Sequence, residues 1–281
     1  MCKPYDIILA MKKVSVIIPC YNQAKYLKDA VNSVFNQTYS NIEIVVIDDC
    51  SKDNPESIVK EFKNITFLKN EENKGVSYSR NKAIEKASGE YILPLDADDK
   101  IAPKYIEKAV EVLENNPSIG IVYCRAQYFG KKNKEVKLKP FNKKDFIYGN
   151  CIFNCALFRK KDFQKTGGYN ENMRFGDEDY DLWLSFIELG LDVYQIPEIM
   201  FFYRKHFTPS RTKSAIKNIK ETQNQIIKNH TKLYLESDEL GERVFYNPEK
   251  INKKYQKYKK LYLIALILFI LALLTIILLI L

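Results

Sequence analysis

The first half of the chain alternates between short apolar runs and amphipathic segments, and no other feature of the sequence constrains the fold as strongly. Val14 to Pro19 is rich in β-branched residues, as in a buried strand. The same pattern predicts further strands at 42–47, 66–68, 91–95 and 119–123, with helices at 26–35, after Asp53-Asn54-Pro55, at 76–87 and at 103–113. Strands that alternate with helices form a largely parallel sheet covered on both faces. The sequence therefore predicts an α/β fold of the doubly wound kind.

The second half of the chain has a less regular pattern. We expect a strand at 153–158, a helix at 177–189 and an extended segment at 196–203. The inward face of that helix should carry Leu182, Trp183, Phe186, Ile187 and Leu189. A polar helix is predicted at 211–235, with a narrow apolar line of Ile219, Ile226 and Leu233.

The chain ends in twenty-one residues without a charge, Leu261 to Leu281. A helix of that length reaches about 30 Å, which matches the hydrocarbon core of a bilayer. A buried core helix is the alternative, but core helices of this length normally keep a polar face. The expected organisation is an N-terminal arm (1–12), a globular body (13–247), a lysine-rich stem (248–260) and a transmembrane helix (261–281).

The net charge of +9 is concentrated beside this tail. Six lysines lie between positions 250 and 260, and without them the excess falls to three. Lysines beside a membrane span favour the cytoplasmic side and attract anionic lipid. We therefore expect a single-pass C-terminal anchor, contact with membrane lipids and a cytoplasmic body. RNA binding by the lysine- and tyrosine-rich stem is the alternative, but no RNA-binding module is recognisable, so no nucleic-acid partner is expected.

The six cysteines form no C-x-x-C pair, which argues against a zinc or redox motif. Free buried thiols in a reducing compartment are the simple expectation. Residues 1–10 are too short and too polar for a signal peptide, and Met11 is an alternative start.

Polar residues follow three of the predicted strands at the point where each strand ends. Ligands of open α/β sheets bind beyond these carboxyl ends. Asp48 and Asp49 follow one strand, and Asp96, Asp98 and Asp99 follow another. Clustered carboxylates repel one another unless a cation joins them, so the set predicts a metal and ligand site, although Asp48 or Asp99 alone could serve only a turn. Neither G-x-G-x-x-G nor G-K-[ST] is present, which disfavours dinucleotide-redox and P-loop sites.

An ordered series of short motifs carries a family resemblance. The series comprises Lys13-Val-Ser-Val-Ile-Ile-Pro-Cys-Tyr-Asn22, Ser33-Val-Phe-Asn-Gln-Thr38, Val46-Ile-Asp-Asp-Cys-Ser51, Asn73-Lys-Gly75, Ser79-Arg-Asn81, Gly89-Glu-Tyr-Ile92, Asp96-Ala-Asp-Asp99, Gly167-Gly-Tyr169 and Glu178-Asp-Tyr-Asp-Leu-Trp183. It resembles the inverting family 2 nucleotide-sugar glycosyltransferases, which have the GT-A fold. Each motif alone is weak, but the ordered set is specific, and it runs from about Val14 to His206.

The resemblance implies a role for each matching residue. It implies that Pro19, Tyr21 and Asn22 line the nucleotide pocket, that Asp49 accepts a hydrogen bond from uracil and that Arg80 holds the base or diphosphate. Asp96 and Asp98 match the D-x-D motif, with Asp98 as the direct metal ligand ahead of Asp96. Glu178 and Asp179 match the acceptor-side motif, and Asp179 matches the catalytic base.

This chemistry also follows from the residue types. A nucleoside diphosphate leaving group carries charge that Mg²⁺ or Mn²⁺ neutralises, and carboxylates suit both ions. A base must be ionised at neutral pH, which the first turn of a helix favours. One base without a nucleophilic carboxylate indicates a single displacement with inversion.

The sequence departs from the processive members of the family. Their Q-x-x-R-W motif is absent, and Tyr203-Arg-Lys-His206 stands in its place. This favours the transfer of one sugar, or few, to a glycan or lipid-linked acceptor. His206 either completes the metal shell or is a surface histidine, and whether Lys100 contacts phosphate stays open. Alternatives are transfer to a polyprenyl phosphate and an inactive scaffold, and the intact set of acids disfavours the scaffold.

Overall fold

The computed structural model describes residues 11–206 and 212–235. The chain divides into two compact units, 1–233 and 234–281, and the second is described only as far as Leu235. The predicted boundary at 247, the stem and the apolar tail lie outside the described residues. Within the described ranges, no helix is both long and apolar enough to cross a membrane.

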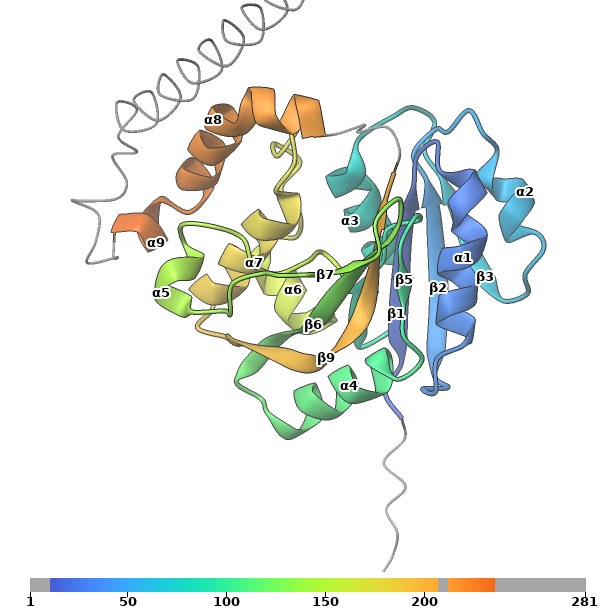
Figure 1. Cartoon of the computed structure of the whole chain (residues 1–281), viewed down its shortest axis with the longest axis horizontal. Helices are drawn as coiled ribbons and strands as arrows, with labels where there is room; N and C mark the ends of the chain where they lie inside the picture. The colour runs from blue at the N-terminus through green and yellow to red at the C-terminus, as the bar shows by residue number, and fades with distance from the viewer. Residues whose placement is uncertain (1–10, 207–211, 236–281) are drawn as a thin grey trace, which may run out of the picture. The chain divides into compact units, whose positions relative to one another are not determined.

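A nine-stranded sheet forms the centre of the first unit (Figure 1). The strands are β1 (Val14–Cys20), β2 (Ile42–Asp48), β3 (Ile65–Lys69), β4 (Tyr91–Pro94), β5 (Lys100–Ile101), β6 (Ile119–Gly130), β7 (Lys134–Val136), β8 (Leu157–Arg159) and β9 (Asp192–Lys205). Their order is β3-β2-β1-β4-β8-β6-β9-β5, with β7 paired to β6.

The sheet is mixed: the expectation of a largely parallel sheet is confirmed for β3, β2, β1 and β4 and for the β6–β9 pair, but it is wrong for β5, β7 and β8, which pair antiparallel. β3, β2, β1 and β4 pair in parallel, but β8 is antiparallel to both of its neighbours, β4 and β6. β6 runs in the same direction as β4, and both end at the same edge of the sheet. After β6 the chain forms the short antiparallel strand β7 and a loop. It therefore enters β8 from the opposite direction.

Helices cover both faces of the sheet. They are α1 (Ala24–Phe35), α2 (Pro55–Val59), α3 (Val76–Lys86), α4 (Tyr105–Asn115), α5 (Lys143–Phe146), α6 (Lys160–Thr166), α7 (Glu178–Glu188), α8 (Thr212–Asn229) and α9 (Thr231–Leu235). One core joins alternate β1 residues to α1 and α4 and includes Leu157 of β8. The next residue, Phe158, points to the other face because strand side chains alternate. There it contacts Phe163 of α6 and Trp183 and Phe186 of α7.

Two details of the predicted helices differ from the structure. Leu189 is 39 % exposed rather than buried, because α7 ends at Glu188 and Leu189 is its C-terminal cap. The single helix predicted at 211–235 is divided at His230 into α8 and α9. On α8, Ile226 is buried as expected, whereas Ile219 is 52 % exposed.

Candidate active site

The carboxyl ends of β1, β2 and β4 meet at one edge of the sheet and carry the predicted site residues. Pro19 is buried within β1, and Tyr21 is exposed just beyond it. Asn22 has a positive φ of 53°. Its backbone N–H donates to Ser51 Oγ at 3.0 Å and its Oδ1 accepts from the Lys52 N–H at 2.9 Å, so it joins the turns after β1 and β2.

Asp49 organises the loop that leads into α3. Its carboxylate accepts hydrogen bonds from Asn70 Nδ2 at 2.8 Å and from the backbone N–H groups of Lys74 and Gly75 at 2.9 Å. Gly75 has a φ of +90°, a conformation that favours glycine. Asp49 is buried directly after β2, at the edge of the sheet where the family resemblance predicts the nucleotide.

Two of the five clustered aspartates serve the backbone. Asp48 Oδ1 accepts from the Ser51 N–H at 2.8 Å and closes the turn after β2. Asp99 Oδ1 accepts from the Arg204 N–H at 2.8 Å and ties the loop after β4 to β9. Burial, and then the charges of Asp98 and Asp96, raise the pKa of Asp99 well above its usual value.

Arg80 joins the metal-motif edge to the start of α7. Its guanidinium is 1 % exposed and donates to Asp96 Oδ1 and Glu178 Oε1, both at 2.8 Å. Burial opposes its charge, but the charge of Asp96, together with the charge and hydrogen bond of Glu178 and the charge of Tyr169, outweighs this effect and raises the pKa of Arg80. The buried guanidinium positions the two carboxylates, and its predicted role in holding the base or diphosphate stays a prediction.

Tyr169 lies under Arg80, and a backbone contact explains two of the sequence motifs. The Arg80 guanidinium carbon lies 5.2 Å from the centre of the Tyr169 ring. Asn81 accepts from the Tyr169 N–H at 2.9 Å and donates to its carbonyl at 2.8 Å. Gly168 has a φ of +89°, and a Cβ there would lie 2.9 Å from Asn81 Oδ1. The glycine therefore permits the contact between the Ser-Arg-Asn and Gly-Gly-Tyr motifs.

Asp98 and His206 form the pair best suited to a metal ion. His206 Nε2 lies 2.6 Å from Asp98 Oδ2, and its Nδ1 lies 3.2 Å from the hydroxyl of Tyr26. Burial, and then the charge of Asp96, raise the pKa of Asp98. Among the described residues no group of three His, Cys, Asp or Glu side chains converges. A carboxylate and an imidazole fit two positions of a Mn²⁺ or Mg²⁺ shell, which leaves the others for substrate oxygens.

Asp179 lies in the first turn of α7, directly after Glu178. Asn150 Nδ2 approaches its Oδ1 at 3.4 Å. Burial, and then the charge of Glu178, raise the pKa of Asp179 to about 8. This corrects the expectation that the helix start keeps the carboxylate ionised at neutral pH, because the helix dipole is worth less than burial beside a second carboxylate.

The comparisons with known proteins agree with this geometry. Residues 15–169 match the family model described as glycosyl transferase family 2. The chain belongs to glycosyl transferase family 2. It is 33 % identical over 234 residues to an uncharacterised glycosyltransferase of Methanocaldococcus jannaschii, covering 78 % of this chain and 79 % of the relative. It is 31 % identical to the putative teichuronic acid biosynthesis glycosyltransferase TuaG of Bacillus subtilis, covering 68 % and 78 %.

Solved structures share the fold at lower identity. TarS of S. aureus (residues 1–349) superposes with a TM-score of 0.64 at 21 % identity, over 80 % of this chain and 66 % of that one. The mannosyltransferase PcManGT from Pyrobaculum calidifontis, solved with GDP-Man and Mn²⁺, gives 0.57 at 20 % identity, over 84 % and 74 %. The chain is thus a nucleotide-sugar glycosyltransferase with a GT-A-like fold.

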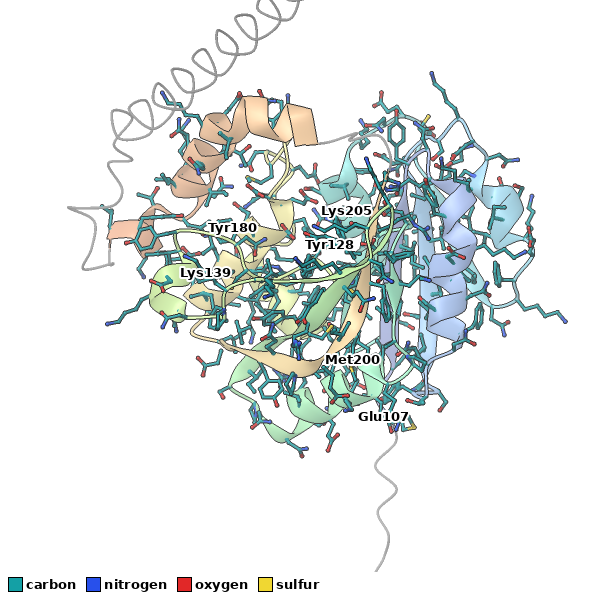
Figure 2. The ribbon with its side chains drawn as sticks, viewed as in Figure 1. Glu107, Tyr128, Lys139, Tyr180, Met200 and Lys205 are labelled. Carbon is teal, nitrogen blue, oxygen red and sulfur yellow. The ribbon has the colours of Figure 1, made fainter. Side chains whose placement is uncertain are left out.

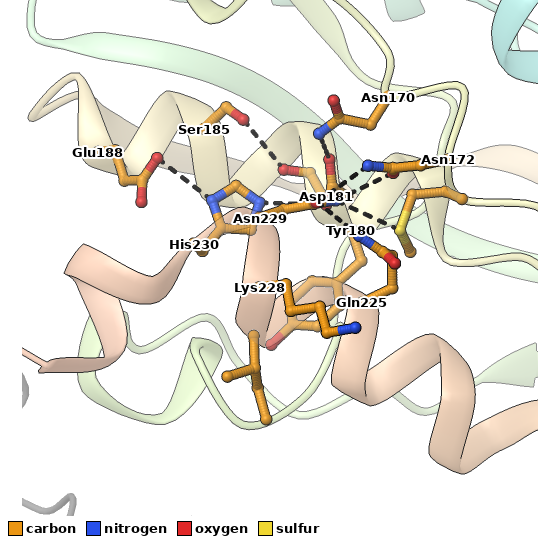
Figure 3. Close-up of polar contacts among 12 residues, drawn as sticks. Asn170, Asn172, Tyr180, Asp181, Ser185, Glu188, Gln225, Lys228, Asn229 and His230 are labelled. Atoms are coloured by element: carbon orange, nitrogen blue, oxygen red, sulfur yellow. Dashed lines mark hydrogen bonds and ion pairs between the residues drawn. The ribbon is translucent and has the colours of Figure 1, made fainter.

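A polar network behind the transferase site was not predicted from sequence. Asp181 of α7 is fully buried and accepts from Asn170 and, at 2.6 Å, from Asn229 Nδ2 (Figure 3). His230 lies 3.3 Å from Asp181 and 3.2 Å from Glu188. These contacts attach the end of α8 to α7, the helix on which Asp179 lies. The available signal was the four-residue spacing of Thr222, Ile226 and His230, which puts these three buried side chains on one helix face.

Lys100 and the cysteines, which were discussed from the sequence, can now be placed in the structure. The Lys100 ammonium lies 4.5 Å from the centre of the Phe129 ring. The described cysteines are free, and all but Cys50 are buried. Burial raises the pKa of Cys20 and Cys124 to about 12, so these thiols are unreactive.

Proposed function

We propose that this transferase moves a single sugar from a uridine diphosphate sugar to a cell-surface glycan or lipid-linked acceptor, with inversion and with a divalent cation. The observation that carries the proposal is the bridge through buried Arg80. The guanidinium joins Asp96 of the D-x-D motif to Glu178 at 2.8 Å each, which ties the diphosphate side to the residue preceding the base.

Each group in the site has a chemical task. The acceptor hydroxyl attacks the anomeric carbon, the carbon–oxygen bond to the diphosphate breaks, and the hydroxyl proton passes to the Asp179 carboxylate. A bound cation would supply charge neutralisation of the diphosphate, held by Asp98 and His206. With its pKa at about 8, Asp179 is about one tenth ionised at pH 7. Its ionised carboxylate is therefore a stronger base toward the acceptor hydroxyl than a carboxylate of ordinary pKa.

The donor and acceptor classes draw on the similar proteins. Structures of TarS have been solved with UDP and with UDP-GlcNAc, and TuaG is named for teichuronic acid biosynthesis. At 20–21 % identity the structures support the fold, so the nucleotide rests on the motif resemblance. The anchoring of the body at the cytoplasmic face of a membrane rests on the uncharged sequence 261–281 and the lysines before it.

The test uses the full chain in non-ionic detergent with a panel of sugar nucleotides. We expect release of uridine diphosphate from one donor, dependence on Mn²⁺ or Mg²⁺, and a product whose anomeric configuration, read by proton NMR, is opposite to that of the donor. Retention of configuration would exclude a mechanism in which Asp179 acts only as a general base. Turnover in excess chelator would exclude a requirement for the cation.

A further inference from the structure

A lysine-rich segment, residues 131–144, borders the site and has no role in the reaction described above. It contains seven lysines and one glutamate. All seven lysines are exposed. The glutamate, Glu135, is neutralised by Arg125, whose Nη2 lies 2.6 Å from Glu135 Oε1. The segment is therefore a strongly positive surface, because its one glutamate is paired with Arg125 and does not neutralise any of the seven lysines.

Several of these charges are not used within the protein. Lys134, Lys137 and Lys139 form no ion pair with any residue in 11–206 or 212–235. Lys132 lies 4.8 Å from the centre of the Tyr128 ring, and Lys205 of β9 lies 4.7 Å from the same ring, which adds a further cation beside the segment. Figure 2 shows Tyr128 and Lys205 together at one end and Lys139 farther along the same strand-and-loop path.

Both ends of the lysine-rich segment are attached to the reaction centre. At the first end, β6 pairs with β9 up to Gly130 and Lys205, one residue before His206. At the other end, the chain passes through α5, where the Tyr180 hydroxyl donates to the Phe146 carbonyl at 2.6 Å. It then reaches Asn150, which contacts Asp179. The residues that flank the segment on both sides therefore contact the elements that carry His206 and Asp179.

We propose that the lysine-rich segment binds the acceptor, and that the acceptor is a polyanionic glycan with repeated carboxylate or phosphate groups. This rests on the proposed function and names the acceptor class of the same site. The lysines are spread along the segment and each is exposed, which suits repeated charges rather than one anion in a closed pocket. The donor is not the occupant, because its diphosphate is assigned to the edge formed by Asp98 and His206.

A membrane surface is the competing occupant, and two observations disfavour it. Lysines alone attract anionic lipid, but stable interfacial binding also buries apolar side chains between the lipids. Within 131–144 the large exposed apolar side chain is Leu138, at 39 % exposure. In addition, Asn150, six residues beyond the segment, contacts Asp179, where an acceptor hydroxyl must enter and a flat lipid surface cannot.

Binding is tested with the full chain in non-ionic detergent and two fluorescent probes, oligogalacturonate and a neutral dextran of equal length. Anisotropy should show salt-sensitive binding of oligogalacturonate and weak binding of dextran. Lys137→Glu/Lys139→Glu should weaken oligogalacturonate binding by at least about tenfold. Lys137→Arg/Lys139→Arg should bind as wild type. Lys63→Glu/Lys161→Glu, which reverses two exposed lysines elsewhere, should also bind as wild type.

Three results would overturn the proposal: equal binding of dextran, unchanged binding by the Lys137→Glu/Lys139→Glu variant, or lysine-dependent binding to phosphatidylglycerol vesicles without any binding of oligogalacturonate. Release of nucleoside diphosphate from the donor without acceptor is measured in parallel and should be equal in all variants. If no donor is consumed while lysine-dependent oligogalacturonate binding persists, the proposed reaction fails and the binding surface stands.

Discussion

Replacing Arg80 by methionine should destabilise the fold strongly, because the change leaves two carboxylates without their buried partner. Arg80 is 1 % exposed, whereas the side chains of Glu178 and Asp96 are 12 % and 30 % exposed. Breaking a buried ion pair costs about 3–5 kcal/mol. Because water still reaches Asp96 and can solvate its charge, the lower end applies, and we expect a loss of about 3 kcal/mol.

A loss of that size should be visible in thermal unfolding. For a domain of this size, 1 kcal/mol shifts Tm by about 2–4 °C, so Arg80→Met should lower Tm by about 6–12 °C. Trp183 is the single tryptophan of the chain and is fully buried on α7, so its fluorescence reports the unfolding of the helix that begins at Glu178.

Two controls separate the buried ion pairs from a general effect of charge removal. Lys60→Met removes an exposed pair with Glu56 and should shift Tm by about 2 °C or less. The double variant Arg80→Met/Glu178→Gln should recover part of the loss, because one orphaned charge is gone. A Tm for Arg80→Met within 2 °C of wild type would refute the idea that Arg80 holds the two sides of the site together.

Other changes in the site have separate expected outcomes. Asp179→Asn should slow transfer by about 10²–10⁴ with little change in donor affinity, and Asp177→Asn should be much milder, as single-turnover rates and donor titration will show. Because the base must be ionised and its pKa is raised to about 8, kcat/KM should rise with pH and level off above about pH 8. Glu178→Gln removes a charge that raises this pKa and should move the rise to lower pH. Asp98→Ala or excess chelator should abolish transfer in an assay of nucleoside diphosphate release. Burial alone would lower the pKa of His230, but the hydrogen bond and charge of Asp181 and the charge of Glu188 raise it. Its ion pairs thus stabilise the fold fully below about pH 6.5 and lose this effect as pH rises through the folded-state pKa, so the stability difference between wild type and His230→Gln should shrink from pH 6 to pH 9 in urea unfolding.

Short apolar runs made β1, β2, β3 and β4 predictable from the sequence. β1 and β2 lie where Val14 to Pro19 and Ile42 to Ile47 were read as strands. The strand predicted at 153–158 overlaps β8 (Leu157–Arg159) at only two residues, and α6 is a polar helix, Lys160–Thr166, without an apolar period. Contacts between Phe158 and Phe163, on β8 and α6, hold these elements in place, and such contacts are tertiary.

The candidate site was predictable as a set of residue types but not as a set of partners. Ordered motifs identified Asp96, Asp98 and Asp179. The task of Arg80 depends on Asp96, sixteen positions away, and on Glu178, ninety-eight positions away, and spacing along the chain does not encode such pairs. Similarly, Asp181 lies among several acids near the start of α7, and only its burial beside His230 distinguishes it.

The raised pKa values of the site have a common cause, burial of the carboxyl groups, to which the charges of neighbouring carboxylates add. Asp98, Asp99 and Asp179 all have raised pKa values, while buried Arg80 is already shared between Asp96 and Glu178. A nucleoside diphosphate adds further negative charge to the same edge. Under the proposed function we expect donor binding to depend on a cation, and by linkage the cation and the donor would each tighten the binding of the other by the same factor. Donor affinity measured with and without Mn²⁺ is thus a direct reading of how strongly this edge of the sheet depends on the metal.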